Sequence, residues 1–164
     1  MYLIVTRSFP PDTGGMQNLM WGLTNAISKH FMVKVFADHN DGSKSLDDNV
    51  SFSIERIGGP KLIRKYRKAY LINDFIKNNK NIKGIIADHW KSLELIKTKK
   101  KKICLIHSKE INHKKGSLLN RRVLKVLNNI DYVISNSKFT KNLAINSGVN
   151  DKKIIVINPG IEPL

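Results

Sequence analysis

Two adjacent glycines, Gly14 and Gly15, lie where an apolar stretch gives way to a helical pattern, and they form the first candidate binding element. Glycines let the backbone approach a ligand closely, and the first amides of a helix have no intrahelical acceptor. The helix dipole adds partial positive charge at the same place. Such a turn favours a phosphate group or another anion. A plain tight turn is the alternative for a lone pair of glycines.

A second candidate group consists of histidines and acids that follow short apolar runs. His107 ends the run at residues 102–106, and an imidazole there can donate a hydrogen bond or titrate near neutral pH. A purely structural histidine is the alternative. Asp88 and His89 follow another run and can bind a hydroxyl, but two ligands make a poor metal site. Glu110 by itself indicates only a solvated acid at a helix entry.

The elements that must position these residues alternate along the chain. Apolar, often β-branched runs predict strands at residues 2–6, 31–37, 50–55, 84–88, 102–106, 131–135 and 153–157. Amphipathic spacing predicts helices at residues 16–30, 62–78, 92–98, 118–128 and 138–147, the last capped by Gly148. Residues 38–49 are expected to be a loop. The fold class is therefore α/β, a Rossmann-like parallel sheet of about seven strands with helices on both faces. Ligands of such sheets bind beyond the carboxyl ends of the strands, where the glycine turn, His89, His107 and Asn136 all fall.

The composition restricts the class of protein. The net charge is +16, from 29 basic and 13 acidic residues, and such a charge attracts nucleic acid, anionic lipid or phosphorylated ligands. Much of the lysine can equally be solvated surface. No apolar run reaches the about 18 residues of a membrane span, and the first residues do not fit a secretory signal. Cys104 is the single cysteine, so no disulfide forms within the chain. We expect a cytoplasmic protein.

Residues 62–72 combine cations with aromatic and aliphatic side chains. An amphipathic basic helix can lie on an anionic membrane, where each cation contributes about 1 kcal/mol. The candidate membrane-facing cations are Arg64, Lys65, Arg67 and Lys68. A helix that packs on the core and leaves a solvated basic edge is the alternative.

Four segments, in order and at matching spacing, resemble the retaining glycosyltransferases of family 4, which have the GT-B fold. FPPDTGGMQ at residues 9–17 resembles the family's opening loop, and IHSKE at residues 106–110 resembles its His-x-x-Glu segment. ISNSKFT at residues 134–140 resembles a strand-to-helix segment in which Ser-x-x-Thr opens the helix, and VINPGIE at residues 156–162 resembles the interdomain hinge. The likeness covers the whole chain and is greatest to enzymes of the phosphatidylinositol mannosyltransferase type. Ser108 is a departure, since many members have glycine there.

The resemblance implies roles at the matching positions. The amides of Gly14 and Gly15 would face the phosphates or the sugar of the donor, and His107 would be the catalytic histidine near the reacting centre. Glu110 would lie beside it and orient the acceptor. The other residues that we expect in the acceptor site or its pocket are Asp12, Gln17, His89, Asn136 and Ser137.

The resemblance also implies a two-domain enzyme. Residues 1–157 would form the N-terminal, acceptor-side domain, and residues 158–164 would form the hinge to an absent or separate C-terminal donor-binding domain. The whole enzyme would transfer a hexose from a nucleotide-diphosphate sugar to a hydroxyl of a glycan or lipid, with retention and without a cofactor or obligatory metal. The chain alone is expected to be inactive. Its implied place is cell-envelope polysaccharide or glycolipid synthesis, in the cytoplasm or at the inner face of the membrane.

Other functions stay open. The chain can be a non-catalytic partner subunit of a split glycosyltransferase. The charge also allows a nucleic-acid-binding module, although the cations are dispersed and no nucleic-acid motif is present, so we expect no specific nucleic acid. An NAD-type Rossmann enzyme is disfavoured, because the Gly-x-Gly-x-x-Gly fingerprint is absent.

Overall fold

Seven parallel strands form one sheet in the computed structural model, which describes residues 1–160. Their order across the sheet is β3-β2-β1-β4-β5-β6-β7, and every neighbouring pair is parallel. The strands are β1 (Tyr2–Val5), β2 (Val33–Asp38), β3 (Ser53–Ile57), β4 (Gly84–Ala87), β5 (Lys101–Ile106), β6 (Tyr132–Ser135) and β7 (Ile154–Val156). The predicted Rossmann-like sheet is confirmed, and all its carboxyl ends lie along one edge.

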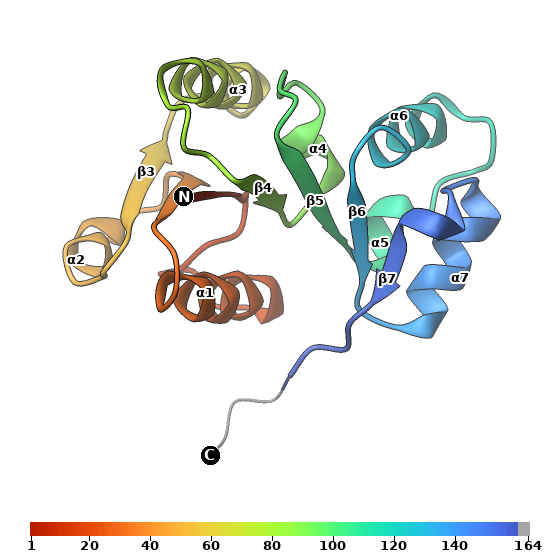
Figure 1. The fold of residues 1–164 in the computed structure, drawn as a ribbon, viewed down its shortest axis with the longest axis horizontal. Coiled ribbons are helices and arrows are strands. Elements are labelled where there is room, and N and C mark those ends of the chain that lie inside the picture. The colour runs from red at the N-terminus through yellow and green to blue at the C-terminus, as the bar shows by residue number, and fades with distance from the viewer. Residues whose placement is uncertain (161–164) are drawn as a thin grey trace.

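Helices cover the two faces of the sheet unequally (Figure 1). They are α1 (Gly15–Ser28), α2 (Ser43–Asp47), α3 (Lys61–Asn78), α4 (Trp90–Leu93), α5 (Ser108–Ile111), α6 (Leu118–Leu127) and α7 (Lys138–Ser147). One face packs on α1, and the opposite face packs on α3, α4 and α6. Alternate residues of β1 serve the two cores, because successive strand side chains point to opposite faces: Leu3 and Val5 join the larger cluster, and Ile4 joins the α1 cluster.

The α1 face is covered only over part of the sheet. Helix α1 packs near β1 and β2, where Val33, Val35 and Met20 are buried. Toward the other end, Ile155 is 45 % exposed and Ile157 is 56 % exposed. Within residues 1–160, no helix covers this face of β6 and β7 (Figure 1).

Two local predictions were wrong. The stretch expected to be a loop contains α2, which is held by an ion pair of 2.7 Å between Asp47 and Arg56. The third strand begins at Ser53 rather than at residue 50, because Phe52 turns into an aromatic cluster with Phe9 and Trp21.

The predicted helix boundaries are right for some helices and wrong for others. The short helix expected at residues 92–98 is α4, at Trp90–Leu93, and α5 was expected only as a helix entry at Glu110. Gly148 has a φ of 108° and ends α7, as predicted.

Candidate functional site

His107 lies directly after β5, at the carboxyl edge of the sheet, and two side chains hold it. The Nδ2 atom of Asn136, which follows the neighbouring β6, lies 3.2 Å from its Nδ1 atom. The carboxylate of Glu110 accepts a hydrogen bond from its backbone amide. The structure therefore brings together His107, Glu110 and Asn136, as the sequence predicted.

The ring of His107 keeps one nitrogen free. With the Asn136 amide donating to Nδ1, the neutral ring carries its proton on Nε2. That Nε2 atom is buried and has no hydrogen-bond partner in the described chain. Burial lowers the pKa of His107 below its ordinary value, while the charge of Asp88 opposes the shift. Burial likewise raises the pKa of Glu110. At neutral pH the imidazole is uncharged and can donate one hydrogen bond to a ligand.

An apolar cavity of about 340 Å³ opens beside His107. Its wall consists of Leu19 and Leu23 from α1, aliphatic side chains of β4, β5 and β6, and Asn136. Residues 157–160 close one side, and they include the first part of the predicted hinge. The rest of that hinge, residues 161–164, lies outside the described residues. We call this cavity the apolar groove.

The glycine turn forms the start of α1, as predicted. The first bond of the helix runs from the amide of Asn18 to the carbonyl of Gly14, at 3.0 Å. The amides of Gly15, Met16 and Gln17 therefore have no intrahelical acceptor. A Cβ atom on Gly15 would meet nothing within 4 Å, whereas one on Gly14 would meet Oε1 of Gln17 at 2.6 Å. The space over Gly15 is open to a ligand.

The glycine turn and His107 both follow carboxyl ends of strands, but the apolar groove beside His107 is not lined by the glycines. The apolar groove is lined by Leu19 and Leu23, one and two turns further along α1 than the glycines. Gln17 lies over the turn itself. The sequence predicted the shared edge, but the expectation that the glycine turn and His107 converge there on one site is not met in the apolar groove.

Two further candidate residues have structural partners. Asp12 is exposed and accepts a hydrogen bond from Nδ2 of Asn40. Ser137 caps α7, where its hydroxyl accepts from the amide of Thr140 at 3.1 Å. This confirms that Ser-x-x-Thr opens the helix. Their roles toward a ligand stay predictions.

His89 caps the short helix α4. Its Nδ1 atom accepts a hydrogen bond of 3.0 Å from the amide of Lys91. Burial, followed by the charges of Arg7 and Lys91, lowers the pKa of His89 to about 4. His89 is therefore neutral at pH 7 and adds no positive charge to this edge of the sheet.

A buried polar network next to His89 was missed by the sequence analysis. The ammonium of Lys68 donates to the carbonyl of Thr6 at 2.7 Å and pairs with Asp38. The Thr6 hydroxyl donates to Oδ2 of Asp88 at 2.6 Å. Burial lowers the pKa of Lys68 and raises the pKa of Asp88. The network ties α3 to the ends of β1, β2 and β4.

The expected membrane-facing cations fall into different environments. Lys68 is only 5 % exposed, so the prediction is wrong for it, because its ammonium is held inside the network. Arg64 and Lys65 are half-buried and pair with Asp38 at 3.3 Å and with Glu94 at 2.6 Å. Arg67 is exposed.

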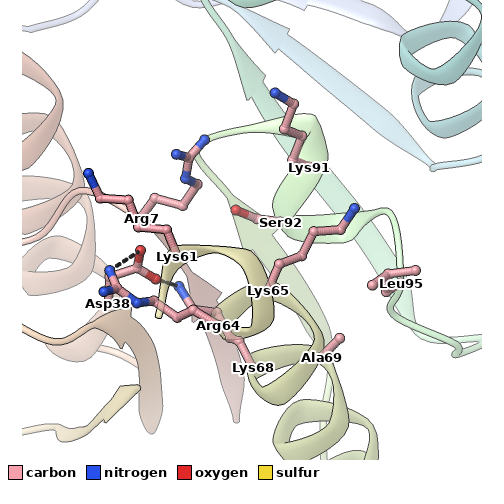
Figure 2. Close-up of a pocket in the computed structure, with 10 residues that line it drawn as sticks. All are labelled: Arg7, Asp38, Lys61, Arg64, Lys65, Lys68, Ala69, Lys91, Ser92 and Leu95. Carbon is pink, nitrogen blue, oxygen red and sulfur yellow. Dashed lines mark hydrogen bonds and ion pairs between the residues drawn. The ribbon is translucent and has the colours of Figure 1, made fainter. Parts of the chain in front are cut away.

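A second cavity, of about 300 Å³, lies over the carboxyl ends of β1, β2 and β4 (Figure 2). We call it the cationic pocket. Its charged lining residues are Arg7, Asp38, Lys61, Arg64, Lys65, Lys68 and Lys91. Four of these cations occupy positions 61, 64, 65 and 68 of α3, the spacing that places side chains on one helix face. That spacing is the signal by which the sequence could have revealed the pocket.

Residues 1–160 lack both a clustered set of metal ligands and a membrane-spanning helix. Residues 1–160 contain no group of three His, Cys, Asp or Glu side chains placed to hold a metal ion. No helix in that range is both long enough and apolar enough to cross a membrane.

The sequence was compared with family models and with curated proteins. The model of Glycosyltransferase Family 4 matches residues 13–163. No curated protein matches the sequence.

Solved structures show the same fold in longer chains. HepE from Anabaena, in complex with UDP-glucose, matches with a TM-score of 0.73 and 15 % identity, over 97 % of this chain and 44 % of that one. Sucrose-phosphate synthase from Thermosynechococcus elongatus matches with a TM-score of 0.75 and 15 % identity, over 98 % and 48 %. UDP-N-acetylglucosamine 2-epimerase from Rickettsia bellii matches with a TM-score of 0.64 and 6 % identity, over 95 % and 44 %.

These identities establish the fold alone. The epimerase carries a different activity in its name, so the architecture does not by itself select one reaction. The chain spans less than half the length of each of the three matched structures.

Proposed function

This chain belongs to glycosyltransferase family 4, and from that premise we propose that it is the acceptor-side half of a retaining hexosyltransferase. The enzyme would transfer a hexose from a nucleotide-diphosphate sugar to a hydroxyl of a glycan or lipid. The match to HepE, whose structure holds UDP-glucose, supports a nucleotide sugar as the donor. The likeness to phosphatidylinositol mannosyltransferases, which rests on the sequence segments alone, supports a lipid-linked acceptor.

The observation that carries this proposal is the state of His107. Asn136 fixes its Nδ1 atom, and its Nε2 atom is buried at the carboxyl edge without a partner. A buried donor left unpaired costs about 1–3 kcal/mol, a cost that a hydrogen bond to substrate removes. His107 therefore serves as a hydrogen-bond donor to a sugar hydroxyl, and Asn136 and Glu110 serve as its positioning residues.

The glycine turn has a separate role in the proposal. The free amides at the start of α1 would stabilise the negative charge that develops on the leaving diphosphate. The open space over Gly15 allows a phosphate to approach the backbone. No metal or other cofactor is needed for this charge stabilisation.

A second domain completes the enzyme in this proposal. The matched structures are about twice as long as the chain, which supports a partner domain that holds most of the donor. Closure of the two domains over the carboxyl edge would exclude water and so limit hydrolysis of the donor. The chain alone would then bind sugar nucleotide weakly.

The exposed side of α3 supports a place at the inner face of a membrane. Leu62 and Tyr70 are 87 % and 71 % exposed, and Ile63, Tyr66 and Arg67 are exposed beside them. Aromatic and aliphatic side chains next to a cation suit the interface of an anionic bilayer. Cosedimentation with anionic and neutral vesicles tests this placement.

A chimera tests the proposed transfer. Residues 1–160 are joined to the C-terminal domain of a family-4 enzyme, and the release of UDP from UDP-glucose is measured with and without acceptor. We expect turnover in the chimera and a loss of about 10–10²-fold in His107→Ala, since a lost hydrogen bond to substrate costs about 1–3 kcal/mol. His30→Ala, a change at an exposed histidine, is the matched control.

Two outcomes would contradict the proposal. Turnover of His107→Ala equal to that of His30→Ala would remove the role assigned to the histidine. An inactive chimera with an intact nucleotide-binding domain would favour a non-catalytic partner subunit instead.

A further inference from the structure

The cationic pocket carries more positive charge than the described chain neutralises. Among its cations, Arg64 and Lys68 share Asp38. Lys65 pairs with Glu94, which also binds Arg122. Within residues 1–160, three lining cations have no carboxylate at ion-pair distance: Arg7, Lys61 and Lys91.

Neighbouring groups respond to this excess charge. The pKa of Lys91 lies below its ordinary value, because burial and the charges of Arg7, Arg122 and Lys65 disfavour the protonated form. His89, on the same edge, has its pKa lowered by burial and then by Arg7 and Lys91. A bound anion would offset the repulsion among these cations and so favour the protonated form of Lys91.

The pocket also offers a neutral donor. The Oγ atom of Ser92 is buried and has no hydrogen-bond partner in the described chain. Figure 2 shows Ser92 in the wall between Arg7 and Lys65, with Asp38 turned toward Arg64 and Lys68. A guanidinium, ammonium groups and a hydroxyl together suit phosphate oxygens. A volume of about 300 Å³ is enough for a small ligand group.

The position of the pocket relates it to the proposed reacting centre. The pocket covers the ends of β1, β2 and β4, and His107 follows the adjacent β5. His89 follows β4, the strand that lies between β1 and β5 in the sheet. A ligand with its charged group in the pocket can therefore extend past His89 toward His107.

We propose that the cationic pocket binds a phosphate or diphosphate group of the acceptor. The acceptor class is then a phosphate-bearing carbohydrate, either a soluble sugar phosphate or a phospholipid headgroup. This inference rests on the proposed transfer to an acceptor hydroxyl. The pocket holds the charged end of the acceptor, and its neutral end carries the hydroxyl toward His107.

Calorimetric titration of the chain with inorganic pyrophosphate measures the binding of a diphosphate group, which both types of acceptor would share. We expect saturable binding that weakens as salt rises. The double variant Arg7→Ala/Lys91→Ala should lose at least 10-fold in affinity, and Ser92→Ala should lose a smaller amount without any change in net charge. Lys99→Ala/Lys152→Ala removes the same charge from two exposed positions outside the pocket and is the matched control.

Two further ligands distinguish the sources of the phosphate. Glucose 1-phosphate that competes with pyrophosphate indicates a soluble acceptor, and phosphatidylinositol vesicles that compete in its place indicate a lipid headgroup. Equal losses in the pocket variant and the control variant would overturn the proposal, and so would the absence of pyrophosphate binding. These titrations need no turnover, so a failure of the pocket is distinct from an inactive chimera.

Discussion

The two cavities at the carboxyl edge of the sheet are similar in size and opposite in chemistry. The cationic pocket, of about 300 Å³, has six cations in its wall and is backed by a buried polar network. The apolar groove, of about 340 Å³, is lined mainly by aliphatic side chains, with His107 and Asn136 at one end. The pocket lies toward α3 and α4, and the groove lies toward α1. The carboxyl edge of the sheet thus has the cationic pocket on its α3 side and the apolar groove on its α1 side.

The difference follows from how the two faces are covered. Helix α3 seals its face of the sheet, so the ends of β1 and β2 become buried and their polar groups must find partners. Helix α1 leaves its face open near β6 and β7, so apolar side chains there stay partly exposed. Removing a polar partner on the α3 face should therefore lower the free energy of unfolding strongly. Removing an aliphatic group on the open part of the α1 face should lower it only slightly.

The largest effect is expected in the network behind the cationic pocket. Lys68→Met should destabilise the chain by about 3–4 kcal/mol, because the carbonyl of Thr6 loses its buried donor and the buried Asp88 loses a neighbouring positive charge, although Asp38 keeps Arg64. Lys65→Met, on the same helix, should cost less than about 1 kcal/mol, since Lys65 is more exposed and Glu94 keeps Arg122. Urea unfolding measures both. An equal loss of stability in the two variants would show that the buried network around Lys68 contributes no more than the ion pair of Lys65.

A matched pair on β5 compares the two faces directly. Ile106 is fully buried in the larger core, whereas the adjacent Leu105 is partly buried at the apolar groove. Ile106→Ala should cost about 2–5 kcal/mol, and Leu105→Ala should cost about 1 kcal/mol. Thermal and urea unfolding of the two variants provide the comparison. A larger cost at Leu105 would mean that the groove is part of the core.

The smallest effect concerns His89, between the cavities. Its pKa of about 4 in the folded chain lies below the ordinary 6.5, so the unfolded chain binds more protons between these values and stability falls as pH falls through that window. The variant His89→Asn keeps a capping acceptor but does not titrate.

The difference between wild type and His89→Asn gives the contribution of His89 to the pH dependence of stability. Between pH 6.5 and 4, wild type should lose about 1–2 kcal/mol more stability than His89→Asn, after allowance for solvent screening. Urea unfolding at several pH values measures the difference. Parallel pH profiles would show that burial and the neighbouring cations do not lower the pKa of His89 in the folded chain.

The sequence predicted the sheet well because its strands are short apolar runs, a local pattern that can be recognised without knowing which elements pack against them. It predicted the caps at Ser137 and Gly148 for the same local reason. It missed α2 and α5, which are too short to show helical periodicity. The start of β3 was also wrong, because Phe52 is drawn away by Phe9 and Trp21 from other elements.

The sequence predicted the site residues that follow the ends of strands, but not the environments that depend on side-chain packing. His107, Glu110 and Asn136 follow strand ends, so their proximity could be foreseen. The environment of Lys68 could not, since Arg67 and Lys68 are alike in sequence and differ only in facing solvent or facing Thr6 and Asp38. The separation of the glycine turn from His107 likewise depends on the side chains of α1.

The first turns of α3 have an inverted distribution of side chains, with cations turned inward and Leu62, Tyr66 and Tyr70 turned outward. This affects how the protein should be engineered for crystallisation or solubility. Replacing Lys61, Lys65 or Lys68, as is routine for reducing surface entropy, would remove cations from the wall of the cationic pocket. The residues available for trimming are the hydrophobic ones, so Leu62→Ser and Tyr70→Ser are the changes to make first.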